Sequence, residues 1–279
     1  MTQMKEQTLD TGDIVLNYAE NDHQGSALMI IHGIMLCWQD MRGFIEPLSQ
    51  THHVFAPDLR GHGNSGHSRF GYPLASYVDD VVHLMNQRVR EPAGIIGSSL
   101  AAIGMAAASP AMTSGVVLLD PPLVMRDCPF DAISYSDVHA VISMMYQART
   151  TNQAPADIAR RIHQLIPEAP DDDALALAHN IRAMDPVAIE YFMDGRLLDG
   201  FDLENAPPTY PLSRSLLLCG EAELGGLIRE TDMELFTSLV EGGTAIQLMG
   251  AAHMLPETTV LNHISVFLAP DAGSRRGGG

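Results

Sequence analysis

The chain of 279 residues contains few cysteines and few basic residues, and both shortages exclude classes of protein. Its three cysteines, Cys37, Cys128 and Cys219, lie far apart without Cys-x-x-Cys spacing. They therefore indicate neither a disulfide framework nor a zinc site, and we expect no metal. Sixteen Lys and Arg stand against 34 Asp and Glu, a net charge of −18. Because phosphate backbones and anionic membranes attract clustered Lys and Arg, we expect no nucleic-acid partner and no membrane partner.

Long apolar runs are also missing. The strongest ones, Ala27–Ile31 and Val116–Leu119, are far too short to cross a bilayer. The first ten residues carry charged side chains and lack the apolar segment of a signal peptide. Hydrophobic residues still make up 46% of the chain, which is enough for a core. These features predict a globular protein of the cytoplasm.

Short β-branched and aliphatic runs alternate with longer stretches of helical spacing. The runs predict strands at Ile14–Tyr18, Ala27–Ile31, Val54–Pro57, Gly94–Gly97, Val116–Leu119, Ser215–Cys219 and Ala245–Met249. The stretches between them predict helices at Trp38–Leu48, Leu74–Val89, Ser99–Ala108, Glu230–Leu239 and Thr258–Leu268. Strands that alternate with helices and are apolar on both faces predict an α/β fold, with a mostly parallel sheet flanked by helices.

The strand pattern disappears between Pro121 and Pro211. Helical spacing replaces it at Ser136–Tyr146, Ala156–Leu165 and Asp173–Met184. We interpret this region as a helical cap inserted over the sheet. The predicted organisation is a core of residues 1–121 and 212–270, a cap of residues 122–211, and a disordered tail of residues 271–279.

The most informative segment runs from Gly94 to Ala101 and places Ser99 between a predicted strand and a predicted helix. A serine on such a tight turn needs very small residues two positions before and after it, because the backbone there is strained and crowded. Gly97 and Ala101 meet that need. The alternative interpretation is a serine that simply caps the following helix.

Three further motifs occur around this serine in a fixed order. His32-Gly33 follows a buried strand, Asp58-Leu-Arg-Gly-His-Gly-Asn-Ser65 follows the next strand, and Gly250-Ala-Ala-His253 comes late in the chain. With these motifs, residues 12–121 and 213–269 resemble the α/β-hydrolase superfamily. The chain departs from the usual pattern at Ala101, where the second glycine of the serine motif is alanine.

The resemblance implies a nucleophilic Ser99 activated by His253, since a serine hydroxyl needs an adjacent base at neutral pH. It also implies an oxyanion hole made by the backbone N–H groups of Ile34 and Leu100. No cofactor is expected. Asp58 and Arg60 are interpreted as residues that order their loop. The substrate pocket is expected to be lined by His32, Gly33, Ser98, Met125 and Met254.

Two carboxylates compete for the role of orienting His253. Many members of the superfamily place the acid after the penultimate strand, where this chain has Glu223. Certain lactonases and amide hydrolases instead take it from the end of the strand that here runs from Val116 to Leu119, which is followed by Asp120. We favour Asp120 and keep Glu223 as the second candidate.

The sequence therefore predicts a serine hydrolase that cleaves a carboxylic ester or lactone of a largely apolar small molecule through an acyl-enzyme. The same residues would also serve hydrolysis of an amide or a carbon–carbon bond. A third hypothesis is a non-catalytic receptor that holds a small molecule in the capped pocket. The sequence does not determine the oligomeric state, for which a homodimer is one option.

Overall fold

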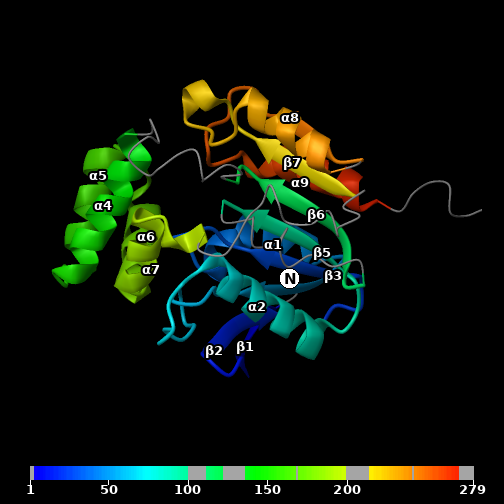
Figure 1. Ribbon diagram of the computed structural model, residues 1–279, viewed down its shortest axis with the longest axis horizontal. Coiled ribbons are helices and arrows are strands. Elements are labelled where there is room, and N and C mark those ends of the chain that lie inside the picture. Colours follow the sequence, from blue (N-terminus) through cyan, green and yellow to red (C-terminus); the bar gives the residue numbers. More distant parts are fainter. Residues whose placement is uncertain are drawn as a thin grey trace, which may run out of the picture.

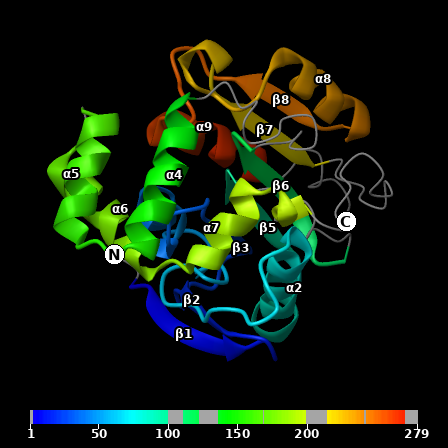
Figure 2. The ribbon, with the colours of Figure 1, turned by 60° about the vertical axis from the view of Figure 1, so that its left-hand side comes forward.

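The computed structural model describes residues 3–99, 111–121, 136–167, 169–198, 214–240 and 242–269 (Figure 1). Within them the chain forms an eight-stranded sheet of order β1-β2-β4-β3-β5-β6-β7-β8. The strands are β1 (Lys5–Asp10), β2 (Val15–Glu20), β3 (Ala27–Ile31), β4 (His53–Pro57), β5 (Ala93–Ser98), β6 (Thr113–Leu119), β7 (Ser215–Cys219) and β8 (Thr244–Gln247). β2 pairs antiparallel with both β1 and β4, and the pairs from β4 to β8 are parallel. β1 and β8 lie at opposite edges (Figure 2).

Helices cover both faces of the sheet because the strands are apolar on both. Leu28 and Ile30 of β3 join one buried cluster, and Met29 and Ile31 join the other. The first cluster includes side chains of α1 (Arg42–Leu48) and α9 (Glu257–Leu268). The second includes side chains of α2 (Leu74–Leu84) and α8 (Glu230–Leu239). Short helices precede α1 (η1, Trp38–Met41) and extend α2 (η2, Met85–Val89), and another follows β7 (η5, Ala222–Leu224).

The segment between β6 and β7 contributes four helices to the described structure, which we call the cap helices. They are α4 (Ser136–Thr150), α5 (Pro155–Leu165), α6 (Asp171–Ala183) and α7 (Pro186–Met193), followed by η4 (Arg196–Leu198). Figure 1 shows them grouped at one side of the sheet. The Asp185 N–H donates to Gly61 O (2.9 Å), and Asn180 Nδ2 donates to Asp40 (2.7 Å). Because Gly61 lies in the loop after β4 and Asp40 lies in η1, which follows β3, the cap helices lie over the carboxyl ends of the strands.

The predicted α/β fold with a mostly parallel sheet is confirmed. Among the described strands and α-helices, β1 and α7 were not predicted from the sequence. β1 is a largely polar edge strand that pairs with β2 alone, so its sequence lacks the apolar run of a buried strand. The predicted helix Ser99–Ala108 beyond Ser99 and the predicted tail of residues 271–279 lie outside the described residues. No described helix has both the length and the apolar character needed to cross a bilayer.

Candidate active site

Ser99 lies immediately after β5 in a left-handed backbone conformation, with φ of +55°. A residue with a Cβ rarely adopts this conformation, and it costs on the order of 1–3 kcal/mol. The Ser99 N–H donates to the carbonyl of Leu119 at the end of the neighbouring strand (3.0 Å), which anchors the turn. A helix N-cap has extended backbone, so the geometry of Ser99 is that of the strained turn and not of a simple cap.

Asp120 lies directly after β6, beside Ser99, and its side chain is fully buried. Its carboxylate accepts the N–H groups of Gly220 (3.2 Å) and Leu227 (2.8 Å). One oxygen also lies 2.7 Å from Nδ1 of His253. Because a carboxylate accepts, Nδ1 carries the proton and the neutral ring keeps Nε2 as an acceptor. This is the tautomer that a general base needs.

Glu223, the second candidate acid, lies on η5, and its side chain is exposed to solvent. Among the described contacts, none joins the Glu223 carboxylate to His253, whose Nδ1 is already bonded to Asp120. The described contacts also include no hydrogen bond between the Ser99 hydroxyl and the His253 ring. Such bonds are often long in the absence of substrate and tighten in the reacting complex.

The loop after β3 passes directly over Ser99. A Cβ placed on Gly33 would lie 3.0 Å from Ser99 Cβ and 3.3 Å from the Ser98 carbonyl, so the backbone approaches as closely as it does because residue 33 has no side chain. Met35, two residues on, has φ of +73° and completes the turn. The turn brings the backbone of Ile34, one of the two expected oxyanion donors, to this side of Ser99. The other donor, Leu100, lies outside the described residues, as does Met125.

His32 was expected to line the pocket, and the structure corrects this. Its ring is completely buried, receives the Leu59 N–H at Nε2 (2.9 Å) and donates from Nδ1 to Gly33 O (2.6 Å). Burial lowers the pKa of His32 to about 4, which keeps the ring neutral. The imidazole therefore joins the loops after β3 and β4 and fixes the turn over Ser99. Of the other described pocket candidates, Gly33 and Ser98 lie next to Ser99, whereas Met254 is 73% exposed and lies beside His253 at the surface.

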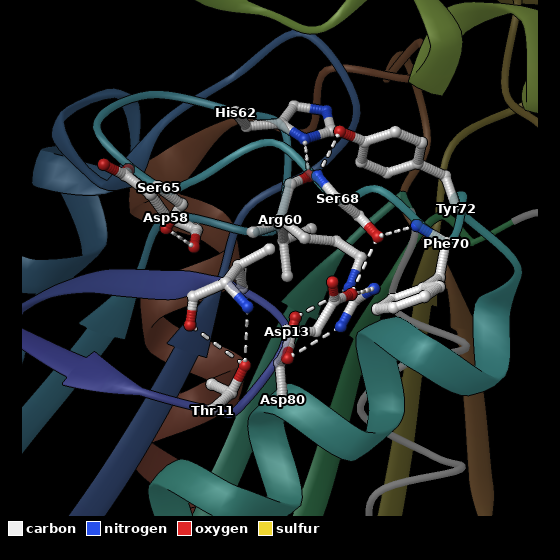
Figure 3. Close-up of polar contacts among 12 residues, drawn as sticks. Thr11, Asp13, Asp58, Arg60, His62, Ser65, Ser68, Phe70, Tyr72 and Asp80 are labelled. Carbon is white, nitrogen blue, oxygen red and sulfur yellow. Dashed lines mark hydrogen bonds and ion pairs between the residues drawn. The ribbon is translucent and has the colours of Figure 1, made fainter.

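The loop after β4 is held by Asp58 and Arg60, as the sequence predicted. The buried Asp58 carboxylate accepts the N–H groups of Trp38 (2.8 Å) and Asn64 (2.9 Å). Arg60 lies between two carboxylates in Figure 3, with paired contacts to Asp80 (2.8 and 2.9 Å) and one to Asp13 (2.9 Å). Sequence reasoning missed these two partners, because both are distant from Arg60 in the chain.

The sequence model of the alpha/beta hydrolase family matches residues 28–272. The chain belongs to this family. The match includes the three loops that carry Ser99, Asp120 and His253. In the described residues, no group of His, Cys, Asp and Glu side chains has the arrangement of a metal site.

Curated relatives match part of the chain. An uncharacterised protein of Mycobacterium tuberculosis is 32% identical over 106 residues, which are 37% of this chain and 31% of that protein. The (E)-2-((N-methylformamido)methylene)succinate hydrolase of Acinetobacter baylyi is 26% identical over 136 residues, or 48% of each chain. The matched part thus spans less than half the length of these relatives.

Solved structures match almost the whole chain. An N-formylmaleamic acid deformylase of Pseudomonas putida has a TM-score of 0.75 at 21% identity and covers 94% of this chain and 99% of its own. An E-2-(acetamidomethylene)succinate hydrolase has a TM-score of 0.69 at 22% identity and covers 95% and 99%. At these identities the likeness shows a shared fold, and the members that share it include hydrolases of several bond types.

Proposed function

We propose that this protein is a serine hydrolase that cleaves a carboxylic ester or lactone of a largely apolar small molecule. One observation carries the proposal. A buried carboxylate, Asp120, fixes the tautomer of His253 at the same sheet edge where Ser99 lies on a strained turn. A base oriented in this way can take the proton of the serine hydroxyl and so activate it as a nucleophile.

In this mechanism the Ser99 oxygen attacks the substrate carbonyl while His253 Nε2 accepts the hydroxyl proton. Asp120 stabilises the imidazolium that forms. Backbone N–H groups of Ile34 and Leu100 bind the oxyanion, which collapses to the acyl-enzyme as His253 returns the proton to the departing alcohol. Water then attacks the acyl carbon with His253 again as base, and the second intermediate collapses as His253 returns the proton to the Ser99 oxygen and the acid product is released. Each proton is taken and returned by His253, so the cycle requires no cofactor.

The charges of the described cap helices support a neutral substrate. The arginines there are already engaged by acceptors of the chain itself. Arg149 bonds to Met184 O, Arg160 to Asp157, Arg161 to Gln147 and Gln153, and Arg182 to Asn152. These arginines bond to separate partners, so the described contacts do not gather them into the cluster that a strongly anionic substrate would need.

Amide hydrolysis is the second candidate, and the named relatives favour it over hydrolysis of a carbon–carbon bond. The Acinetobacter baylyi relative and two structural neighbours are named for substrates with formyl or acetyl groups on nitrogen. Asp120 also follows the strand from which certain lactonases and amide hydrolases take their acid. Only the leaving group differs from the ester reaction, because His253 would then protonate an amine nitrogen.

Intact mass spectrometry after a fluorophosphonate probe tests the proposal. Wild type should gain one adduct that Ser99→Ala loses, while Ser238→Ala, at an exposed serine of α8, should keep it. A panel of ester, lactone and amide substrates that share one acyl group then identifies the bond. An unlabelled wild type that binds small molecules tightly would favour the receptor hypothesis instead.

A further inference from the structure

The loop after β7 contacts both Asp120 and the loop that carries His253. The Gly220 N–H donates to the Asp120 carboxylate at 3.2 Å. One residue later, the Glu221 N–H donates to Ala251 O at 2.8 Å, in the loop that carries His253. The Glu221 side chain bonds to the same loop, since its carboxylate accepts the Gly250 N–H. A two-residue segment therefore connects the acid to the loop of the base.

The loop that carries His253 is packed closely against this segment. The Leu248 N–H donates to Cys219 O at 2.8 Å, where the loop begins. A Cβ on Gly220 would lie 2.3 Å from Ala252 O, so the two backbones touch one residue before His253. Gly250 turns the loop with φ of +75°.

Two side chains hold residues 248–253 through hydrogen bonds among the described contacts, Asp120 and Glu221. Asp120 bonds to the histidine ring itself. Glu221 bonds to the backbone three residues earlier, at the turn that sets the direction of the chain toward His253. Without that acceptor the Gly250 N–H would turn to water, and the loop would keep only the Asp120–His253 hydrogen bond and its backbone contacts with the β7 end.

We propose that Glu221 is a positioning residue that holds the His253 ring in line with Ser99. This inference rests on the proposed serine-hydrolase function. The loop after β7 is where many α/β hydrolases carry the acid of the triad. In this chain the acid comes from β6, and the β7 loop instead supplies the support for the histidine loop. This role requires an oxygen that accepts the Gly250 N–H, and it does not require a negative charge.

Three variants test the proposal in the full-length protein. Glu221→Ala should lower kcat by roughly 10- to 100-fold with KM within about twofold, because small displacements of a catalytic group cost about that much. Glu221→Gln should retain most of the activity, because its amide oxygen still accepts the Gly250 N–H. Glu234→Ala, at an exposed glutamate of α8, should match wild type.

Proton NMR gives a readout that does not depend on turnover. The proton shared by His253 Nδ1 and Asp120 should give a downfield signal in wild type and Glu221→Gln, and a broadened or absent one in Glu221→Ala. Wild-type kcat and signal in Glu221→Ala, or equal impairment in Glu221→Gln, would overturn the role of Glu221. If the signal responds as expected but wild type takes no fluorophosphonate, the serine-hydrolase function fails while the support by Glu221 stands.

Discussion

The Asp120 carboxylate lies 2.7 Å from Nδ1 of His253, although 133 residues separate the two in sequence. The parallel sheet explains the contact, since β6, β7 and β8 are neighbours and end at the same edge. The loop after β8 turns back over the end of β7 and brings His253 to the end of β6. An acid on the middle strand, β7, is therefore unnecessary.

Replacing the two candidate acids separately should distinguish their roles. Asp120→Asn should lower kcat roughly 1,000- to 10,000-fold, because an amide at this place favours the wrong tautomer of the histidine. Glu223→Gln should leave kcat within about twofold, since the Glu223 side chain is exposed on η5. The rates of ester hydrolysis and of fluorophosphonate labelling should be measured for both variants. A larger loss in Glu223→Gln than in Asp120→Asn would assign the acid of the triad to Glu223.

The sequence predicted the fold and much of the candidate site because the signals were local. Buried strands such as Ala27–Ile31 and Ser215–Cys219 have the bounds expected from their apolar runs. Ser99 and His253 were selected as candidates because each follows a predicted strand, and strand ends collect at one edge of a parallel sheet.

The features that were left open or missed depend on distant partners. The choice between Asp120 and Glu223 required knowing which loop folds back over β7. His32 was placed in the pocket because its position in the motif does not reveal that Leu59 and Gly33 take both ring nitrogens. Likewise, no local pattern marks Glu221 as a partner of Gly250.

Gly33→Ala should impair catalysis more than folding. The added methyl would lie 3.0 Å from Ser99 Cβ, which forces the loop and its Ile34 N–H away from the nucleophile. Loss of an oxyanion donor costs on the order of 100-fold or more in kcat. Gly115→Ala is the matched control, because its methyl would meet Phe267 at the same 3.0 Å, at the opposite end of the sheet. The hypothesis fails if both variants show equal kcat.

Asp185 should stabilise the attachment of the cap helices to the core. Its carboxylate accepts the Tyr72 hydroxyl (2.6 Å) and caps α7 through the Val187 N–H (3.0 Å). Asp185→Ala should lower the free energy of unfolding by about 2–4 kcal/mol, since a cap is removed and a buried hydroxyl loses its acceptor. Urea unfolding measures this change, and limited proteolysis should show earlier cleavage within the cap helices.

Two variants control the Asp185 experiment. Asp185→Asn keeps an oxygen that accepts the Val187 N–H, and its NH2 group can donate to the Tyr72 hydroxyl oxygen, so it should cost about 1 kcal/mol or less. Asp172→Ala removes an exposed carboxylate from the first turn of α6 and should cost less than about 1 kcal/mol. An Asp185→Ala protein as stable as Asp172→Ala would show that the contact with Tyr72 contributes nothing.

Acid should destabilise the protein partly through two buried histidines. Burial lowers the pKa of His32 to about 4 and that of His62 to about 3, with the neighbouring His32 adding to the effect on His62. Both pKa values lie below the ordinary histidine value near 6.5. At a pH between the lowered pKa and 6.5, the unfolded chain therefore binds more protons than the folded one. The stability that these rings contribute is present above about pH 6.5 and falls as the pH drops toward 4, by roughly 1.4 kcal/mol per pH unit for each histidine.

His62→Gln isolates one of these contributions, because glutamine does not titrate and its amide still offers a donor for the Arg60 carbonyl that His62 Nδ1 contacts at 2.9 Å. Urea unfolding between about pH 7 and pH 4 should show a shallower loss of stability in this variant than in wild type. His179→Gln, on the exposed face of α6, should follow the wild-type curve, because that ring is in water in both states. Parallel curves for wild type and His62→Gln would mean that the folded protein admits a proton to this ring, and that burial does not keep His62 neutral.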